Sequence, residues 1–223
     1  MDFLAGAWAL FLKDARVELR TRYALGALGL FVAASLVLLR LALGRAEVAP
    51  ETAAALLWVV ILFAAALGLG RAFVAEEERG TVLLLQLALP PSAVYAGKLA
   101  FNVALTLVVN LVAAGGFFVL IGTSVALPGL LLATLALGAV GLAGTTTLLS
   151  ALLARTAGGS PLLAVLAFPV LVPLLFSAVR LTLLALTPGT TWADGTQDLL
   201  SLVGFAGLTI TASALLFEYV WRD

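Results

Sequence analysis

No charged residue interrupts residues 99–154, which read LAFNVALTLVVNLVAAGGFFVLIGTSVALPGLLLATLALGAVGLAGTTTLLSALLA. A transmembrane helix needs about 20 apolar residues to cross ~30 Å of hydrocarbon, so this segment is too long for one helix. It is also too apolar for a loop in water. The Gly-Thr-Ser break at 122–124, followed by Pro128, divides it into two predicted spans at 99–121 and 128–154.

The rest of the chain has the same character. Of its 223 residues, 63% are hydrophobic and 11% are charged, which excludes an ordinary soluble domain. Charges and prolines separate four further apolar segments. We therefore predict an all-α, polytopic protein with one membrane domain over 23–223 and spans at 23–43, 52–70, 99–121, 128–154, 161–186 and 199–217.

Residues 1–22 have a different pattern. Six charged residues, all between 13 and 22, accompany an apolar series at helical spacings of three and four, formed by Trp8, Phe11, Leu12, Ala15 and Leu19. This predicts an amphipathic helix lying on the cytoplasmic membrane surface. A secretory signal is the alternative, but the apolar stretch that follows is too long and no cleavage site stands out.

Basic residues set the expected orientation, because Lys and Arg are retained on the cytoplasmic side. With the N-terminus inside, the predicted cytoplasmic segments hold nine of the twelve: Lys13, Arg16, Arg20, Arg22, Arg71, Arg79, Lys98, Arg155 and Arg222. Only Arg40, Arg45 and Arg180 fall toward the other side. Both termini are therefore expected in the cytoplasm.

Composition also limits the chemistry. The chain has no His and no Cys, and its only Met is Met1, so the usual ligands for zinc or heme iron are missing. Every Asp and Glu lies outside the six predicted spans, which argues against a proton relay or ion-driven transporter. We expect a non-catalytic subunit with no catalytic, cofactor-binding or metal-binding residues of its own.

The longest predicted connection, 71–98, lies on the cytoplasmic side. Three glutamates at 76–78 suit a solvated loop, but Val82 to Leu89 is too apolar to be left in water. A short helix ended by Gly80, or a second helix before Pro90, fits this composition. We favour a docking element for a cytosolic protein.

Within the spans, Asn102, Thr106 and Asn110 form one polar stripe, interpreted as interhelical hydrogen bonding. Gly138, Gly141 and Gly144 indicate close helix packing. Pro169 and Pro173, four residues apart, are expected to bend their helix and are hinge candidates.

Taken in order along the chain, a set of short motifs resembles heme exporter protein B, the CcmB family. The motifs are Lys13-Asp14, Glu18-Leu19-Arg20, Leu57-Trp58-Val59, Arg71-x-Phe73, Glu76 to Gly80, Leu87-x-Leu89-Pro90, Gly97-Lys98 and Phe168-Pro169-x-x-x-Pro173-Leu174.

The resemblance implies a permease subunit of an ABC-2-type transporter for cytochrome c maturation in the bacterial inner membrane. It implies pairing with a second copy of itself and with a cytosolic CcmA-type ATPase that binds ATP. CcmC-type and CcmD-type membrane proteins and a CcmE-type heme chaperone are the other expected partners. The connection between spans 2 and 3 would couple to the ATPase, which places that role on Glu76, Glu77, Glu78, Arg79 and Gly80.

Since this chain lacks the usual iron ligands, we expect partner subunits to hold the heme and this subunit to drive its delivery or the release of the loaded chaperone. Two alternatives stay open at this point. One is an ABC-2-type exporter of a lipid, drug or polysaccharide, and the other is a scaffold without nucleotide coupling.

Overall fold

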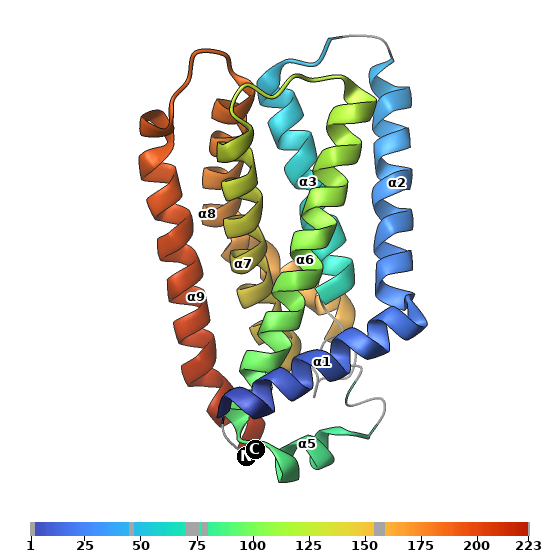
Figure 1. Ribbon diagram of the computed structural model, residues 1–223, viewed down its shortest axis with the longest axis vertical. Helices are drawn as coiled ribbons and strands as arrows, with labels where there is room; N and C mark the ends of the chain where they lie inside the picture. Colours follow the sequence, from blue (N-terminus) through green and yellow to red (C-terminus); the bar gives the residue numbers. More distant parts are fainter. Residues whose placement is uncertain (1–2, 45–46, 70–75, 77–79, 154–158, 223) are drawn as a thin grey trace.

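The computed structural model describes residues 3–44, 47–69, 76, 80–153 and 159–222. The described part is helical and contains no strand, and six of its helices are long and apolar enough to cross a membrane (Figure 1). The protein is therefore a multi-pass membrane protein, as the sequence predicts. The helices are α1 (Phe3–Thr21), α2 (Tyr23–Leu43), α3 (Pro50–Leu69), α5 (Val82–Ala88), α6 (Pro91–Ile121), α7 (Pro128–Leu153), α8 (Gly159–Leu186) and α9 (Thr196–Arg222), with a 3-10 turn η1 (Trp192–Gly195).

Two helices differ from the spans expected for them. Helix α6 begins at Pro91 rather than at residue 99, because proline suits the first position of a helix and Lys98 does not end it. Helix α9 is longer than the predicted 199–217 at both ends. Helix α8 continues through both internal prolines, and a hinge at Pro169 and Pro173 stays a prediction.

Helix α7 is the centre of the bundle and packs against α3, α6, α8 and α9. Its glycines permit this, since a Cβ added at Gly138 would meet the Trp58 ring and one at Gly141 would meet Leu174. The glycine series read from the sequence therefore does serve close packing.

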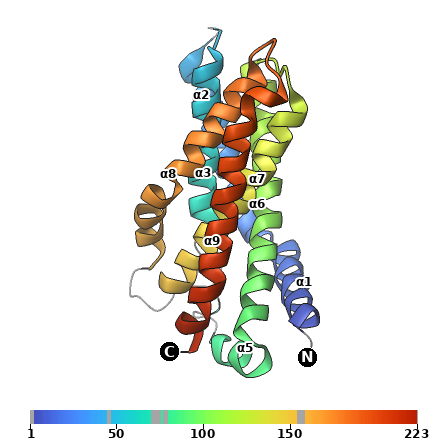
Figure 2. The same cartoon turned by 90° about the vertical axis from the view of Figure 1, so that its left-hand side faces the viewer.

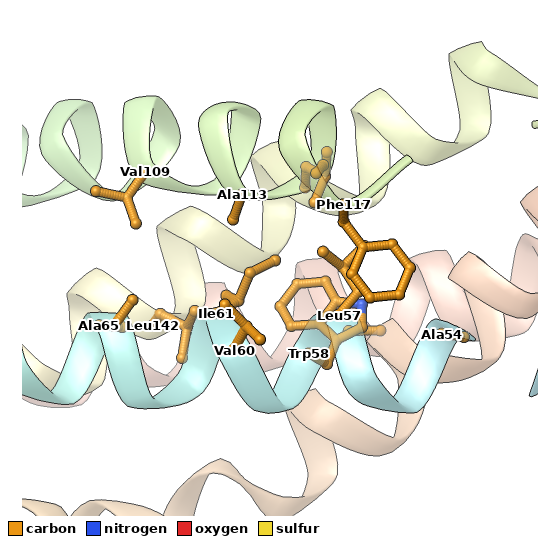
Figure 3. Packing of buried hydrophobic residues seen from close by; sticks show 14 of the residues in the cluster. Ala54, Leu57, Trp58, Val60, Ile61, Ala65, Val109, Ala113, Phe117 and Leu142 are labelled. Carbon is orange, nitrogen blue, oxygen red and sulfur yellow. The ribbon is translucent and has the colours of Figure 1, made fainter. Parts of the chain in front are cut away.

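Helices α3 and α6 meet in the apolar core. Figure 3 shows Trp58 and Ile61 of α3 opposite Ala113 and Phe117 of α6, and all four side chains are buried. The Trp58 Nε1–H donates to Thr182 Oγ1 at 2.8 Å, which satisfies the one polar atom of the indole and ties α3 to α8.

Two residues of the polar stripe of α6 make the predicted interhelical hydrogen bonds, both to α7, whereas Thr106 Oγ1 donates to the Asn102 carbonyl of its own helix at 2.7 Å. Asn102 Nδ2 donates to Thr147 Oγ1 at 2.7 Å, and Asn110 Nδ2 donates to the Leu135 carbonyl at 3.0 Å. Hydrogen bonds of this kind replace water as partners inside a bilayer and hold two helices in register.

Helices α1 and α5 lie with both chain ends at one end of the bundle, here called the basal end (Figure 2). Helix α1 crosses this end obliquely, over the start of α6, before the chain turns into α2 (Figure 1). The predicted N-terminal helix is thus present, and its position on a membrane surface stays a prediction. The opposite end carries the turns that follow α2, α6 and α8.

Candidate functional site: a buried ionic network at the basal end

Four charged side chains from three separate parts of the chain meet at the basal end. Lys98 Nζ of α6 lies 2.9 Å from Asp14 Oδ2 of α1 and 2.7 Å from Glu76 Oε1. Lys13 Nζ lies 2.6 Å from the same Glu76 oxygen and 3.4 Å from Asp14 Oδ1. We call these four residues the basal network.

The basal network is balanced and largely withdrawn from solvent. The side chains of Lys98 and Glu76 are each 4% exposed and that of Asp14 is 11% exposed, whereas Lys13 is 40% exposed. Two positive and two negative charges cancel. Because an unpaired buried charge is strongly unfavourable, removing any one member leaves its neighbours uncompensated.

Glu76 is held ionised at this position. Burial alone raises the pKa of its carboxyl, but the charge of Lys98 and the hydrogen bonds from Lys13, Lys98 and Thr81 outweigh burial and lower the pKa from 4.5 to about 2. Thr81 donates its hydroxyl to the second carboxylate oxygen, Oε2. The carboxylate therefore stays charged throughout the physiological range.

Close backbone contact between α1 and α6 brings the network together. A Cβ added at Gly97 would come within 2.7 Å of the Ala7 carbonyl oxygen and 2.9 Å of the Leu10 Cβ. Asp14 follows Leu10 by four residues and so lies on the same face of α1. The glycine thus allows the approach that lets Asp14 reach Lys98.

The residues predicted to couple to an ATPase begin with Glu76. Gly80 has a φ of 66°, and the Thr81 N–H donates to the Glu76 carbonyl at 3.0 Å, the geometry that closes a helix C-terminus at a glycine. Glu77, Glu78 and Arg79 lie outside the described residues. The Glu76 side chain turns into the protein, so its contacts are internal, and the coupling role of the segment stays a prediction.

Helix α5 follows directly and has two apolar faces. Val82, Leu85 and Leu89 pack against a small core formed by Leu10, Val94, Tyr95, Phe217 and Trp221. Gln86 Nε2 donates to the Trp221 carbonyl at 2.8 Å, which attaches α5 to the end of α9. The other face exposes Leu83, Leu84 and Leu87, with 64%, 65% and 78% of each residue accessible.

Sequence reasoning did not bring Lys13, Asp14 and Lys98 together with Glu76. These residues are separated by up to 85 positions, and no local pattern pairs them. A weak signal was available, since Lys98 stands alone between two apolar segments and requires a counter-charge if the helix continues past it.

The family model described as CcmB protein matches residues 5–216 of the chain. A comparison with curated protein sequences gives no significant match.

Proposed function

The chain belongs to the CcmB family, and we propose that it couples ATP hydrolysis in a CcmA-type partner to heme delivery, or to release of a heme-loaded chaperone. The family itself is that of a membrane permease subunit, not an enzyme, in heme export for cytochrome c maturation. The family match favours this role over export of a lipid, drug or polysaccharide.

The exposed apolar face of α5 carries the proposal. An exposed apolar surface of this kind, at the end of a membrane bundle, is typical of a protein interface. Its opposite face is packed against α1, α6 and α9, so a force applied to α5 is passed directly to the helices around it. We assign Leu83, Leu84 and Leu87 as the contact surface for the ATPase.

In this proposal the basal network supplies a second connection. Glu76 precedes α5 by six residues and is bonded to α1 through Lys13 and to α6 through Lys98. Movement of the segment 71–98 on ATP binding would therefore shift α1 and α6 together. The interior residue Glu76 transmits the movement, whereas α5 receives it.

Heme is assigned to partner chains. The 223 residues include neither His nor Cys, and Met1 is their only Met, so the side chains that usually hold heme iron are absent from them. We further assign the protein to the bacterial inner membrane with the basal end in the cytoplasm. The positive-inside distribution of Lys and Arg supports this orientation, as does the gathering of α1, α5 and both chain ends on one side.

The test is co-purification with a CcmA-type ATPase in mild detergent. Replacing Leu84 and Leu87 by Ser should reduce the amount of retained ATPase at least fivefold, because an apolar contact of about 3 kcal/mol is lost. Leu19→Ser is the matched control, since Leu19 is similarly exposed on α1 at the same end. Equal retention by all three proteins would show that α5 is not the docking surface.

A further inference from the structure

Helix α1 has three distinct faces. The first, with Gly6, Leu10 and Asp14, turns toward α6 and is largely withdrawn from solvent. The second is an exposed apolar ridge of Leu4, Trp8 and Leu19, and the third is an exposed basic ridge of Arg16 and Arg20. Only the first face has a partner among the described residues.

Glu18 fixes how these faces are oriented relative to the spans. Its Oε1 accepts the Leu25 N–H at 2.8 Å, so this edge of α1 points to the base of the first span, α2. Because an α-helix turns by about 100° per residue, Leu4, Trp8 and Leu19 lie next to Glu18 around the axis of α1, on its outer side. Arg16 and Arg20 lie at about 160° and 200° from it, on the side away from the spans.

We propose that α1 is a binding surface for anionic phospholipids of the leaflet at the basal end. The apolar ridge sits among the upper acyl chains, and Arg16, Arg20 and Arg22 bind lipid phosphate groups. In this position the apolar side chains of α1 lie nearest the bilayer and its basic side chains lie further out, as in a helix that lies in a membrane interface. Binding of this kind requires the bilayer that surrounds the six spans and is independent of ATP coupling.

The charges of α1 support an anionic ligand. Both acids within helix α1, Phe3–Thr21, are engaged internally, Asp14 by Lys98 and Glu18 by the Leu25 N–H. Within the described part of the chain, no ion pair joins Arg16, Arg20 or Arg22 to an acid, although all three are exposed. The outer surface of α1 is therefore strongly positive next to an apolar strip, which is complementary to a phosphate above acyl chains.

Arg22 stands at the corner between α1 and α2, with a φ of 52°. Glycine adopts this left-handed conformation more easily than any residue with a Cβ. A substitution at this corner can therefore distinguish an effect on lipid binding from an effect on folding. Arg22→Gly relaxes the backbone and removes the guanidinium at the same time.

The test uses the full chain, purified in a neutral detergent and incubated with mixed micelles holding equal amounts of phosphatidylglycerol and phosphatidylcholine. Native mass spectrometry then counts the lipids retained per protein. Wild type should retain phosphatidylglycerol in at least fivefold excess. Replacing Arg16, Arg20 and Arg22 together by Gln should abolish the excess, while replacing all three by Lys should keep most of it.

Two single changes serve as controls. Arg16→Gln should lower phosphatidylglycerol retention and Arg40→Gln should not, since Arg40 lies at the far end of α2. Arg22→Gly should lower retention without lowering the melting temperature, which excludes misfolding as the cause. Equal retention of both lipids by wild type, or an undiminished excess in the triple Gln variant, would overturn the proposal. So would a change from dimer to monomer in that variant with unchanged lipid, which would show that a second copy covers α1.

Discussion

Replacing Lys98 by Met is the sharpest test of the basal network. Lys98 Nζ contacts Asp14 Oδ2 at 2.9 Å and Glu76 Oε1 at 2.7 Å, and Met fills similar volume without the charge. Two buried carboxylates would then share only the half-exposed Lys13. Breaking a buried pair by removing one partner costs roughly 3–5 kcal/mol, and because Lys13 stays we expect the lower end, about 3 kcal/mol.

For a chain of this size each kcal/mol shifts the melting temperature by about 2–4 °C, so Lys98→Met should melt about 6–12 °C below wild type. Helix content followed on heating in detergent measures this. The double variant Lys98→Met with Glu76→Gln removes one charge of each sign and leaves Lys13 with Asp14. This double variant should recover at least half of the decrease in melting temperature that Lys98→Met causes. A single variant that melts within about 2 °C of wild type would contradict this role of Lys98, and so would a double variant that is less stable than the single one.

Two further predictions concern the pH dependence of stability and the packing around glycines in the helix bundle. Because folding lowers the pKa of Glu76 from 4.5 to about 2, its contribution to stability is complete above about pH 4.5 and is lost as pH falls toward 2. The gap in melting temperature between wild type and Glu76→Gln should therefore narrow below about pH 4.5, and a constant gap down to about pH 3 would contradict this. Gly138→Ala should cost about 1–3 kcal/mol because its Cβ meets Trp58. Gly115→Ala, with nothing within 4 Å, should instead gain roughly 0.5–1 kcal/mol in the same unfolding measurement.

Most of the membrane architecture could be predicted from the sequence because hydrocarbon imposes strict local rules. Long apolar segments must be helical, and turns must contain residues that end helices. Gly122, with a φ of 81°, ends α6 where the Gly-Thr-Ser break predicts it. The stripe of Asn102 and Asn110 likewise follows from helical spacing alone.

The start of α6 and the surroundings of Glu76 could not be predicted in this way. The predicted span begins at residue 99, directly after Lys98, because a charge is unfavourable inside a membrane. In the structure its charge is cancelled by Asp14 and Glu76, so the helix continues on both sides of it. Those partners are distant in sequence, and only tertiary packing brings them together. Similarly, three consecutive glutamates suggest a solvated loop, and nothing in the local sequence indicates that the Glu76 side chain turns inward.

The basal network also constrains the order in which the chain can assemble. A ribosome makes Lys13 and Asp14 long before Lys98, and the close packing of α1 against Gly97 cannot form until α6 has been made. The ion pair between Asp14 and Lys98 must therefore wait until the two spans before α6 have been synthesised. Closure of the basal network thus requires that the third span is in place.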